Sequence, residues 1–431
     1  MARVASLLRA RTRRGVLALA GRRGGEVAAS DRVPARLTWP LRRDGLDPGD
    51  RLSRLSEDEP VHLLTSFLGL KVWLVTAPDQ ARSVLANEVD FSNDIRPHIG
   101  SRGPVTGGDI GGLGFTDPPE HTRLRHLLTP QFTVRRLERL RPLVTGIVER
   151  QLDALESRGP VVDLVPEFAF PVPFSVICEL LGLPDRDRET FRQLGSQRFD
   201  VRHGGHGTFG AASRSRDFLL EATRRQRARP GDGLIGDIIR NHGDEVSDLE
   251  LAGLADGVFT GGLETSASML ALGTAVLLEH PDDYRALVDR PESVEPTVEE
   301  LLRYLSVVQV AFPRFARHDL VLAGRHVAEG DVVVCHLAAA NRAGDGRHGY
   351  DAARGHGSHL AFGHGFHRCV GAELARMELR TAFPALARRF PDLALAVPPD
   401  RFDLRQLSIV FGIGSLPVRL VTDRTGPSPA G

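Results

Sequence analysis

The chain has 431 residues, of which 41% are hydrophobic and 26% are charged. This composition excludes a disordered chain, and the length suits one large domain or two to three smaller ones. The 55 lysine and arginine side chains are balanced by 55 aspartate and glutamate side chains, so no global basic field favours nucleic acid as a partner. The three cysteines, Cys178, Cys335 and Cys369, are too scattered for a disulfide framework or a paired zinc site.

The N-terminal stretch, residues 1–29, is rich in arginine and contains only a short apolar run at residues 16–20. That run is far shorter than a secretory signal core or the roughly 18 residues of a membrane span. We therefore expect a cytoplasmic protein with no membrane span. The expected organisation is a flexible N-terminal tail (residues 1–38), one domain (39–422) and a flexible C-terminal tail (423–431). A weak attachment of the arginine-rich tail to a membrane surface is the alternative.

Most of the chain shows the apolar spacing of amphipathic helices. Residues 124–155 form one such stretch, which Pro130 and Pro142 divide into at least two predicted helices. The longest predicted helix runs from Leu249 to about Glu279. It follows a capping-box pattern, Ser-Asp-Leu-Glu at residues 247–250, and ends before a His-Pro pair.

Strand character is concentrated in residues 319–337, where short apolar runs alternate with tight turns. Two glycine-rich stretches, residues 100–114 and 203–210, are predicted to be loops, which either cover a functional site or are disordered. No linker of clear Pro/Ser/Gly composition divides the chain. The predicted fold is therefore mainly α with a small β portion, in one large domain built around a long central helix.

The strongest functional signal is the run Phe-Gly-His-Gly-Phe-His-Arg-Cys-Val-Gly-Ala-Glu at residues 362–373, which is followed by a helical pattern. It delivers Cys369 to the start of a helix, where backbone N–H groups and the helix dipole favour a thiolate over a thiol. Gly363, Gly365 and Gly371 let the backbone pass close to a large flat ligand. The alternative is a buried cysteine acting as a small apolar side chain, which is our interpretation of Cys178 and Cys335.

Two further patterns lie on predicted helices. Gly261 and Gly262 stand in the middle of the longest helix, just before Glu264 and Thr265. Each glycine costs about 1 kcal/mol relative to alanine, so either a ligand approaches the backbone there or two helices pack closely. Three residues apart, Glu300 and Arg303 share one face of a helix that begins near Pro296. Without other context that pair would be a surface ion pair of little energetic value.

Together these motifs resemble those of the cytochrome P-450 family of haem-thiolate enzymes, from about Trp39 to the end of the chain. The resemblance implies a single large P-450 fold that binds haem b (iron protoporphyrin IX), with Cys369 as the axial iron ligand. The haem-binding signature would include Phe362, Gly363 and Gly371. Four side chains match residues that neutralise or bind the haem propionates in the family: His121, Arg125, Arg314 and His367.

The resemblance also assigns roles on the two helices. Thr265 would hydrogen-bond iron-bound oxygen, and Glu264 would link it to solvent as a proton source. Glu300 and Arg303 would form a buried structural network with a third, basic residue from the meander that follows. That meander looks shortened by a few residues here, which leaves Arg347 and Arg354 as candidates.

The implied activity is a monooxygenase reaction that consumes O2 and hydroxylates or epoxidises a lipophilic small molecule, in secondary metabolism. Because the chain has no flavin, nicotinamide or iron–sulfur fingerprint, electrons from NAD(P)H would arrive through a ferredoxin and a ferredoxin reductase. Arg368, Arg376 and Arg123 are expected to steer that ferredoxin to the proximal face. The predicted substrate pocket is mostly apolar, with Gln309 able to orient one polar group. The pocket residues implied by the family are Val258, Gly261, Val308, Gln309, Val310 and Phe411.

Three alternatives remain open from the sequence. The substrate could be an amino acid tethered to a carrier protein. The protein could be a peroxygenase, although such an enzyme would not need the Glu264–Thr265 pair. It could also be a non-catalytic haem sensor of the same fold.

Overall fold

The computed structural model describes residues 38–67, 69–97, 112–198, 208–344, 348–354 and 357–420. The two predicted tails, apart from residue 38, and most of both glycine-rich loops lie outside these ranges, as does Arg347.

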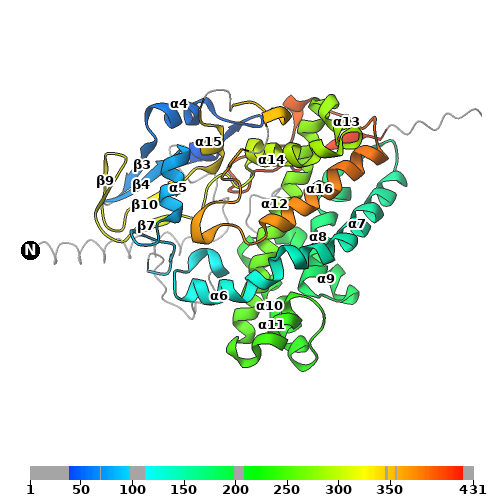
Figure 1. Ribbon diagram of the computed structural model, residues 1–431, viewed down its shortest axis with the longest axis horizontal. Helices are drawn as coiled ribbons and strands as arrows, with labels where there is room; N and C mark the ends of the chain where they lie inside the picture. The colour runs from blue at the N-terminus through cyan, green and yellow to red at the C-terminus, as the bar shows by residue number, and fades with distance from the viewer. Residues whose placement is uncertain are drawn as a thin grey trace, which may run out of the picture.

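The described residues are mainly helical, with small sheets at one end (Figure 1), as the sequence predicted. The helices in chain order are α4 (Asp50–Asp58), α5 (Pro78–Ala86), α6 (Glu120–Leu128), α7 (Val134–Glu156), α8 (Pro171–Leu181), α9 (Asp185–Arg198), α10 (Thr208–Ala228), α11 (Leu234–His242), α12 (Asp248–Glu279), α13 (Pro281–Asp289), α14 (Val294–Leu305), α15 (Leu337–Arg342) and α16 (Ala372–Arg389).

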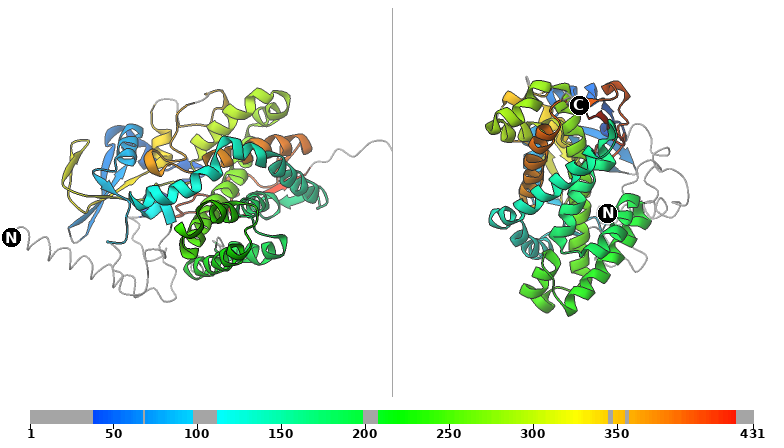
Figure 2. Two further views of the ribbon diagram at one scale, coloured as in Figure 1. Left: turned by 60° about the horizontal axis from the view of Figure 1, so that its bottom comes forward. Right: turned by 90° about the vertical axis from the view of Figure 1, so that its right-hand side faces the viewer.

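The long helix α12 forms the axis of the helical part and packs against α8, α10 and α16. Its start is fixed by the predicted capping box, in which the Ser247 side chain accepts from the backbone N–H of Glu250 and the Glu250 side chain accepts from the backbone N–H of Ser247. In the left view of Figure 2 the blue helices lie with the strands at one end of the molecule, apart from the green helices. By length and composition α12 could cross a membrane, but 72% of its most apolar window is buried inside the fold. It is a core helix of this domain.

The prediction for residues 124–155 was right about Pro130 and wrong about Pro142. A 3-10 turn, Thr129–Phe132, contains Pro130 and separates α6 from α7, whereas Pro142 lies inside the continuous helix α7. Proline removes one helical hydrogen bond, and α7 tolerates this loss because one of its faces is buried on both sides of the proline, including Leu137 and Val144.

The main sheet has five short strands in the order β3-β4-β10-β7-β5. These are β3 (Val61–Phe67), β4 (Leu70–Val75), β10 (Val332–Cys335), β7 (Arg314–Ala316) and β5 (Phe91–Ser92); β4 and β10 pair in parallel and the other neighbours are antiparallel. A three-stranded sheet has the order β11 (Ala394–Leu395), β12 (Pro417–Arg419), β6 (Val161–Asp163). The chain also forms two small hairpins, β1 (Arg43–Asp44) with β2 (Asp47–Pro48) and β8 (Leu320–Leu322) with β9 (Arg325–Val327).

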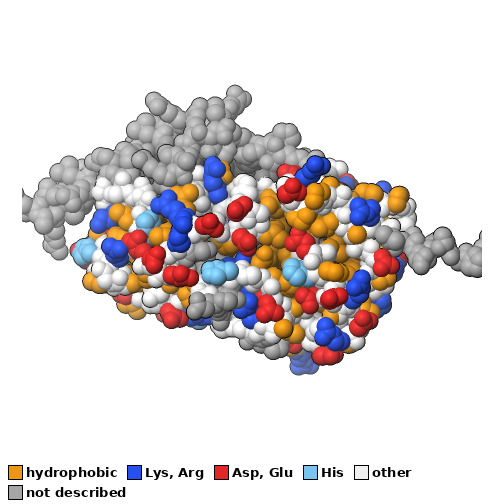
Figure 3. All heavy atoms as spheres, turned by 90° about the horizontal axis from the view of Figure 1, so that it is seen from above, with side chains coloured by type: hydrophobic (Ala, Val, Ile, Leu, Met, Phe, Trp, Pro, Cys, Tyr) orange, Lys and Arg blue, Asp and Glu red, His pale blue; other side chains and the backbone are white. Residues whose placement is uncertain are grey.

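The strands predicted in residues 319–337 are thus confirmed as β8, β9 and β10. The tight turn between β8 and β9 has positive φ at both central residues, 46° at Ala323 and 77° at Gly324, as a two-residue hairpin requires. The surface reflects the balanced charge of the sequence, because basic and acidic side chains are interspersed on the face seen in Figure 3.

Candidate functional site

The cysteine loop folds back on itself before α16 begins. The backbone N–H of Cys369 donates to the Phe362 carbonyl at 2.9 Å, and the N–H of Gly363 donates to the Leu360 carbonyl at 2.8 Å. Gly363 and Gly365 both have positive φ, 69° and 72°. A side chain at Gly365 would also place its Cβ 2.6 Å from the Leu85 carbonyl oxygen of α5. This position therefore requires glycine for two reasons, its φ and its close approach to α5.

Cys369 is enclosed by the fold yet its side chain remains accessible, as expected for a residue that lines an internal space. Burial raises the pKa of its thiol, while the Gly371 N–H and the charges of Arg125 and Arg368 act in the opposite direction. The helix N-terminus alone would favour the thiolate, so burial is the larger effect in the protein without iron. Cys178 and Cys335 are buried, and burial raises the pKa of each thiol to about 12, consistent with their interpretation as apolar packing residues.

Beside this loop lies a cluster of basic side chains in which three nitrogen atoms lack hydrogen-bond partners. The rings of His121 and His367 are 4.2 Å apart between centroids. Among the described residues, Nε2 of both histidines and Nε of Arg314 are buried without a hydrogen-bond partner. Burial and the positive charge of Arg125 lower the pKa of His121 to about 4, and burial, His121 and Arg314 lower that of His367 to about 3.

Each buried polar atom without a partner costs about 1–3 kcal/mol, so the basic cluster (His121, Arg125, Arg314 and His367) has the chemistry of an anion site. Burial also removes water from the guanidinium groups of Arg125 and Arg314, and this loss of hydration lowers the pKa of both groups. An anion placed among these four groups would satisfy the donors and reverse the pKa shifts of the histidines.

On α12 the two adjacent glycines have different environments. A Cβ at Gly261 would meet nothing within 4 Å, whereas a Cβ at Gly262 would lie 3.0 Å from Cδ1 of Ile177 on α8. The Thr265 hydroxyl donates to the Gly261 carbonyl at 2.5 Å and so competes for an acceptor of the helix backbone. Gly261 therefore borders open space, as a ligand groove requires, and Gly262 serves close helix packing.

Glu264 is not simply open to solvent, because Nη1 of Arg405 donates to its carboxylate at 3.0 Å. The side chains are 14% and 18% exposed for Arg405 and Glu264. Sequence reasoning missed Arg405, which lies 141 residues from Glu264 in the chain and stands in no motif.

The Glu300–Arg303 pair is buried, with 1% and 2% of the side chains exposed. Nε of Arg303 donates to Oε2 of Glu300 at 2.7 Å and Nη2 donates to Oε1 at 2.8 Å. Of the two candidates for the third member, Arg354 lies at the pair, with its Nε 3.4 Å from Oε1 of Glu300. The Asp351 N–H donates to the same oxygen at 2.9 Å.

The neighbouring Glu299 forms a second network that sequence reasoning missed. It accepts from Nε and Nη2 of Arg376 at 2.7 and 2.8 Å, and His359 lies 3.2 Å away. Burial alone would raise the pKa of Glu299, but the Arg376 and His359 contacts hold it well below its usual range. Arg376 is only 13% exposed and lies over the Phe362 ring. Its guanidinium therefore ties α16 to α14 and to the cysteine loop. A contribution of Arg376 to ferredoxin steering stays a prediction.

Two segments that carry predicted pocket residues, 307–312 and 409–411, lie side by side. Val308 bridges to Val410, and the N–H of Gln309 donates to the Ile409 carbonyl at 2.9 Å. Gln309 itself is buried, and its side chain accepts from Nε of Arg43 at 2.9 Å and donates to the Leu41 and Ser408 carbonyls. Its predicted role in orienting a substrate is therefore wrong, since a structural network occupies both ends of the amide.

Phe411 is also fully buried, under the guanidinium of Arg43 at 4.2 Å from the ring centroid, so it packs the core instead of facing a substrate. Val258, Val308 and Val310 are half-buried. Two large apolar side chains in the same two segments are more accessible, Phe312 at 49% and Ile409 at 59%.

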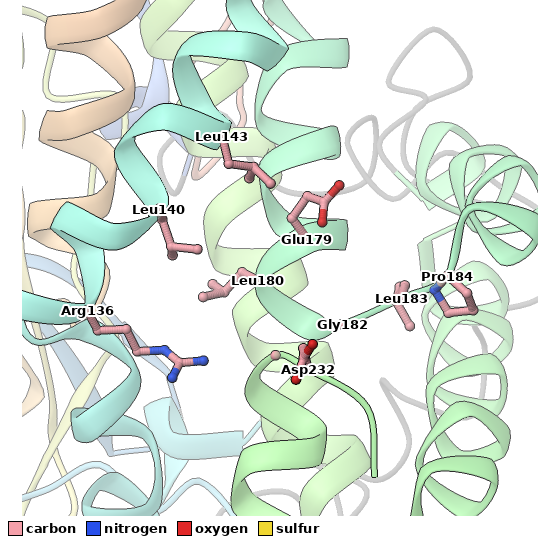
Figure 4. Close-up of a pocket in the computed structure, with 10 residues that line it drawn as sticks. Arg136, Leu140, Leu143, Glu179, Leu180, Gly182, Leu183, Pro184 and Asp232 are labelled. Carbon is pink, nitrogen blue, oxygen red and sulfur yellow. The ribbon is translucent and has the colours of Figure 1, made fainter. Parts of the chain in front are cut away.

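A separate groove lies on the outside of the helical part, where α7 and α8 meet the turn before α11 (Figure 4). It has a volume of about 390 Å³, and its lining includes Leu140, Leu143 and Pro184. It contains none of the residues predicted for the cysteine loop, the basic cluster or the central helix.

The chain is similar to known proteins over most of its length. Cytochrome P-450 FAS1 of Rhodococcoides fascians is 39% identical over 392 residues, covering 89% of this chain and 98% of that protein. The chain belongs to the cytochrome P-450 family. The structure of OxyE, a P-450 involved in teicoplanin biosynthesis, matches with a TM-score of 0.82 and 38% identity over 88% of this chain and 99% of that one. OxyB, solved in complex with the X-domain from teicoplanin biosynthesis, matches with a TM-score of 0.79 and 38% identity over 90% of this chain and 100% of that one. No protein-family model matches the sequence.

The family implies a haem, and the residues of this P-450 fit one. Haem carries two propionates, and the basic cluster offers buried donors without an acceptor at His121, Arg314 and His367. The cysteine loop presents an accessible sulfur beside that cluster, and Arg125 is close enough to Cys369 for their charges to interact. The protein is a cytochrome P-450 monooxygenase, as the names of its relatives indicate.

Proposed function

We propose that this P-450 binds haem b through Cys369 and hydroxylates or epoxidises a lipophilic small molecule. The observation that carries the proposal is the accessible Cys369 next to three buried nitrogen atoms without partners, Nε2 of His121, Nε2 of His367 and Nε of Arg314. A structural cysteine would need neither feature.

Bound thiolate-ligated haem supplies the activation of O2, with one oxygen atom inserted into the substrate and the other released as water. The chain's own residues would hold and serve that group. Arg125, Arg314 and the two histidines of the basic cluster would pair with the propionates. The Thr265 hydroxyl, half-buried beside the open space at Gly261, would pass protons toward the reacting oxygen, and Glu264 would resupply them.

An apolar substrate is supported by the accessible Phe312 and Ile409 and the half-buried Val308 and Val310, all on two adjacent segments. Full burial of a completely exposed side chain of this kind contributes about 1.5–3 kcal/mol. Because Phe312 and Ile409 are 49% and 59% exposed, burying each against a ligand would contribute about half of that. We propose that the electrons come from NAD(P)H through a separate ferredoxin and its reductase in the cytoplasm.

A substrate tethered to a carrier protein is the second candidate. It is favoured by the similarity to OxyE and to OxyB, the latter solved with a partner domain. Such a substrate would be delivered by surface contacts in addition to the apolar pocket.

The test is the visible spectrum of the purified ferric protein, titrated with lipophilic metabolites and with free and carrier-loaded amino acids. A low-spin to high-spin change with a free lipophilic ligand supports the first candidate. A change only with the carrier-loaded form supports the second, and a protein that takes up no haem contradicts both.

A further inference from the structure

The C-terminal hairpin, which closes with the Leu404–Ile413 bridge, sends one arginine to the central helix. Nη1 of Arg405 donates to Glu264 at 3.0 Å, and Nη2 donates to Oγ of Ser268 at 3.2 Å. Glu264 and Ser268 are four residues apart and so lie on one face of α12. The guanidinium thus spans one helical turn of α12, and Thr265 follows Glu264 in the chain.

The hairpin is built to leave room for this side chain. The Arg405 N–H donates to the Gly412 carbonyl at 2.8 Å. A Cβ at Gly412 would lie 2.5 Å from Nη2 of Arg405 and 2.7 Å from Oγ of Ser268. No side chain fits at that position while Arg405 contacts α12.

The contact falls next to the residues of α12 that are proposed to serve the reaction. The Thr265 hydroxyl donates to the Gly261 carbonyl, and Gly261 borders open space. A charge-assisted hydrogen bond from Arg405 restricts the rotamers that the Glu264 carboxylate can adopt at this position.

We propose that Arg405 is a positioning residue, which holds Glu264 at the mouth of the proton path to Thr265 and acts on the reaction only through Glu264. This inference rests on the proposed proton role of Glu264 and Thr265. It predicts that loss of Arg405 has the same functional consequence as loss of Glu264.

The functional test uses the haem-loaded protein with a surrogate ferredoxin, its reductase and NADPH, without substrate. Two-electron reduction of O2 uses one NADPH and one proton from solution and yields hydrogen peroxide. Four-electron reduction uses two NADPH and two protons from solution and yields water, and it requires proton delivery to break the O–O bond. We expect Arg405→Gln and Glu264→Gln each to raise the peroxide released per NADPH, and the double variant to equal the single variants. Arg405→Lys should restore part of the wild-type ratio.

The matched control is Arg401→Gln, because Arg401 is exposed on the same C-terminal segment and its loss removes the same charge. It should leave the peroxide ratio at the wild-type value. An unchanged ratio in Arg405→Gln, or additive effects in the double variant, would overturn the proposal. A wild-type protein without a thiolate-haem spectrum would instead overturn the proposed function.

A second measurement does not depend on turnover. Carbodiimide labelling of carboxylates, read by mass spectrometry on the haem-loaded protein, should modify Glu264 several-fold faster in Arg405→Gln than in the wild type or in Arg401→Gln, because the anchor that holds the carboxylate against α12 is gone. Equal labelling in all three proteins would show that Arg405 does not hold the carboxylate.

Discussion

The buried Glu300–Arg303 pair allows a sharp test, because the same spacing occurs elsewhere in the chain on the surface. Replacing Glu300 by glutamine keeps the shape of the side chain and removes its charge. Glu300 accepts two hydrogen bonds from Arg303 at 2.7 and 2.8 Å and one from the Asp351 N–H at 2.9 Å. Arg303 would keep its contacts to the carbonyls of Asn341 and Gly349, but its charge would be buried without a counter-ion.

Breaking a buried ion pair by removing one partner costs about 3–5 kcal/mol, against a total stability of roughly 5–15 kcal/mol for a domain. We therefore expect Glu300→Gln to lower the urea midpoint strongly and to reduce haem content, measured as Soret absorbance per mole of protein. The control is Glu138→Gln. Glu138 pairs with Arg141 at the same spacing, at 2.8 and 2.6 Å, but both side chains are about half exposed, 53% and 47%. Its midpoint and haem content should match the wild type, and similar losses in both variants would refute the argument from burial.

Further predictions concern the central helix and the basic cluster. Gly261→Ala should raise the free energy of unfolding by about 0.5–1 kcal/mol, because alanine favours a helix more than glycine does. It should also slow the rebinding of carbon monoxide to the ferrous protein, because the new Cβ enters the open space. A slower rate in Gly262→Ala instead would show that the wrong glycine has been assigned to the groove. A third histidine outside the cluster, His336, is fully buried with its Nε2 2.7 Å from the Pro40 carbonyl, and burial lowers its pKa to about 4. The folded pKa is also about 4 for His121 and about 3 for His367. Because unfolded histidines bind protons near pH 6.5, the haem-free protein should lose stability as the pH falls from about 6.5 to about 4. Each of the three histidines contributes a slope of about 1.4 kcal/mol of unfolding free energy per pH unit. Haem should reduce this pH dependence, since its propionates favour the charged forms of His121 and His367. The assay is the unfolding midpoint at several pH values, with and without haem, and a midpoint that does not change with pH in the haem-free protein would contradict the prediction.

The features predicted correctly from the sequence are those set by residues close together in the chain. The capping box that starts α12 depends on contacts between Ser247 and Glu250 only. The turns of the cysteine loop likewise depend on glycines within a few residues of Cys369. Local backbone preferences decide such features, so a single sequence suffices to predict them.

The features that were missed or misassigned depend on pairs far apart in the chain. The family resemblance places Gln309 in the pocket, but its amide meets Arg43, 266 residues away. Glu299 and Arg376 meet across 77 residues. No spacing rule predicts such partners, because only the packed fold brings them together.

The Glu-x-x-R pattern shows the same limit within one motif. It occurs six times, at Glu120, Glu138, Glu189, Glu221, Glu300 and Glu373. The glutamate pairs with the arginine three residues later at Glu138, Glu189, Glu300 and Glu373, whereas Arg123 pairs with Glu250 and Glu221 lies near Arg225. Of these four pairs, the one at Glu300 has both side chains buried and is joined by Arg354. Spacing therefore permits the pair, and the packed fold decides whether it forms and whether it is structural.

The central claim is that Cys369 is the ligand of the haem iron. The most direct test compares the ferrous carbon monoxide spectra of the wild type, Cys369→His and Cys178→Ala. We expect the red-shifted Soret band of thiolate-ligated haem in the wild type and in Cys178→Ala, and its loss in Cys369→His. A thiolate-type spectrum that persists in Cys369→His would contradict the account.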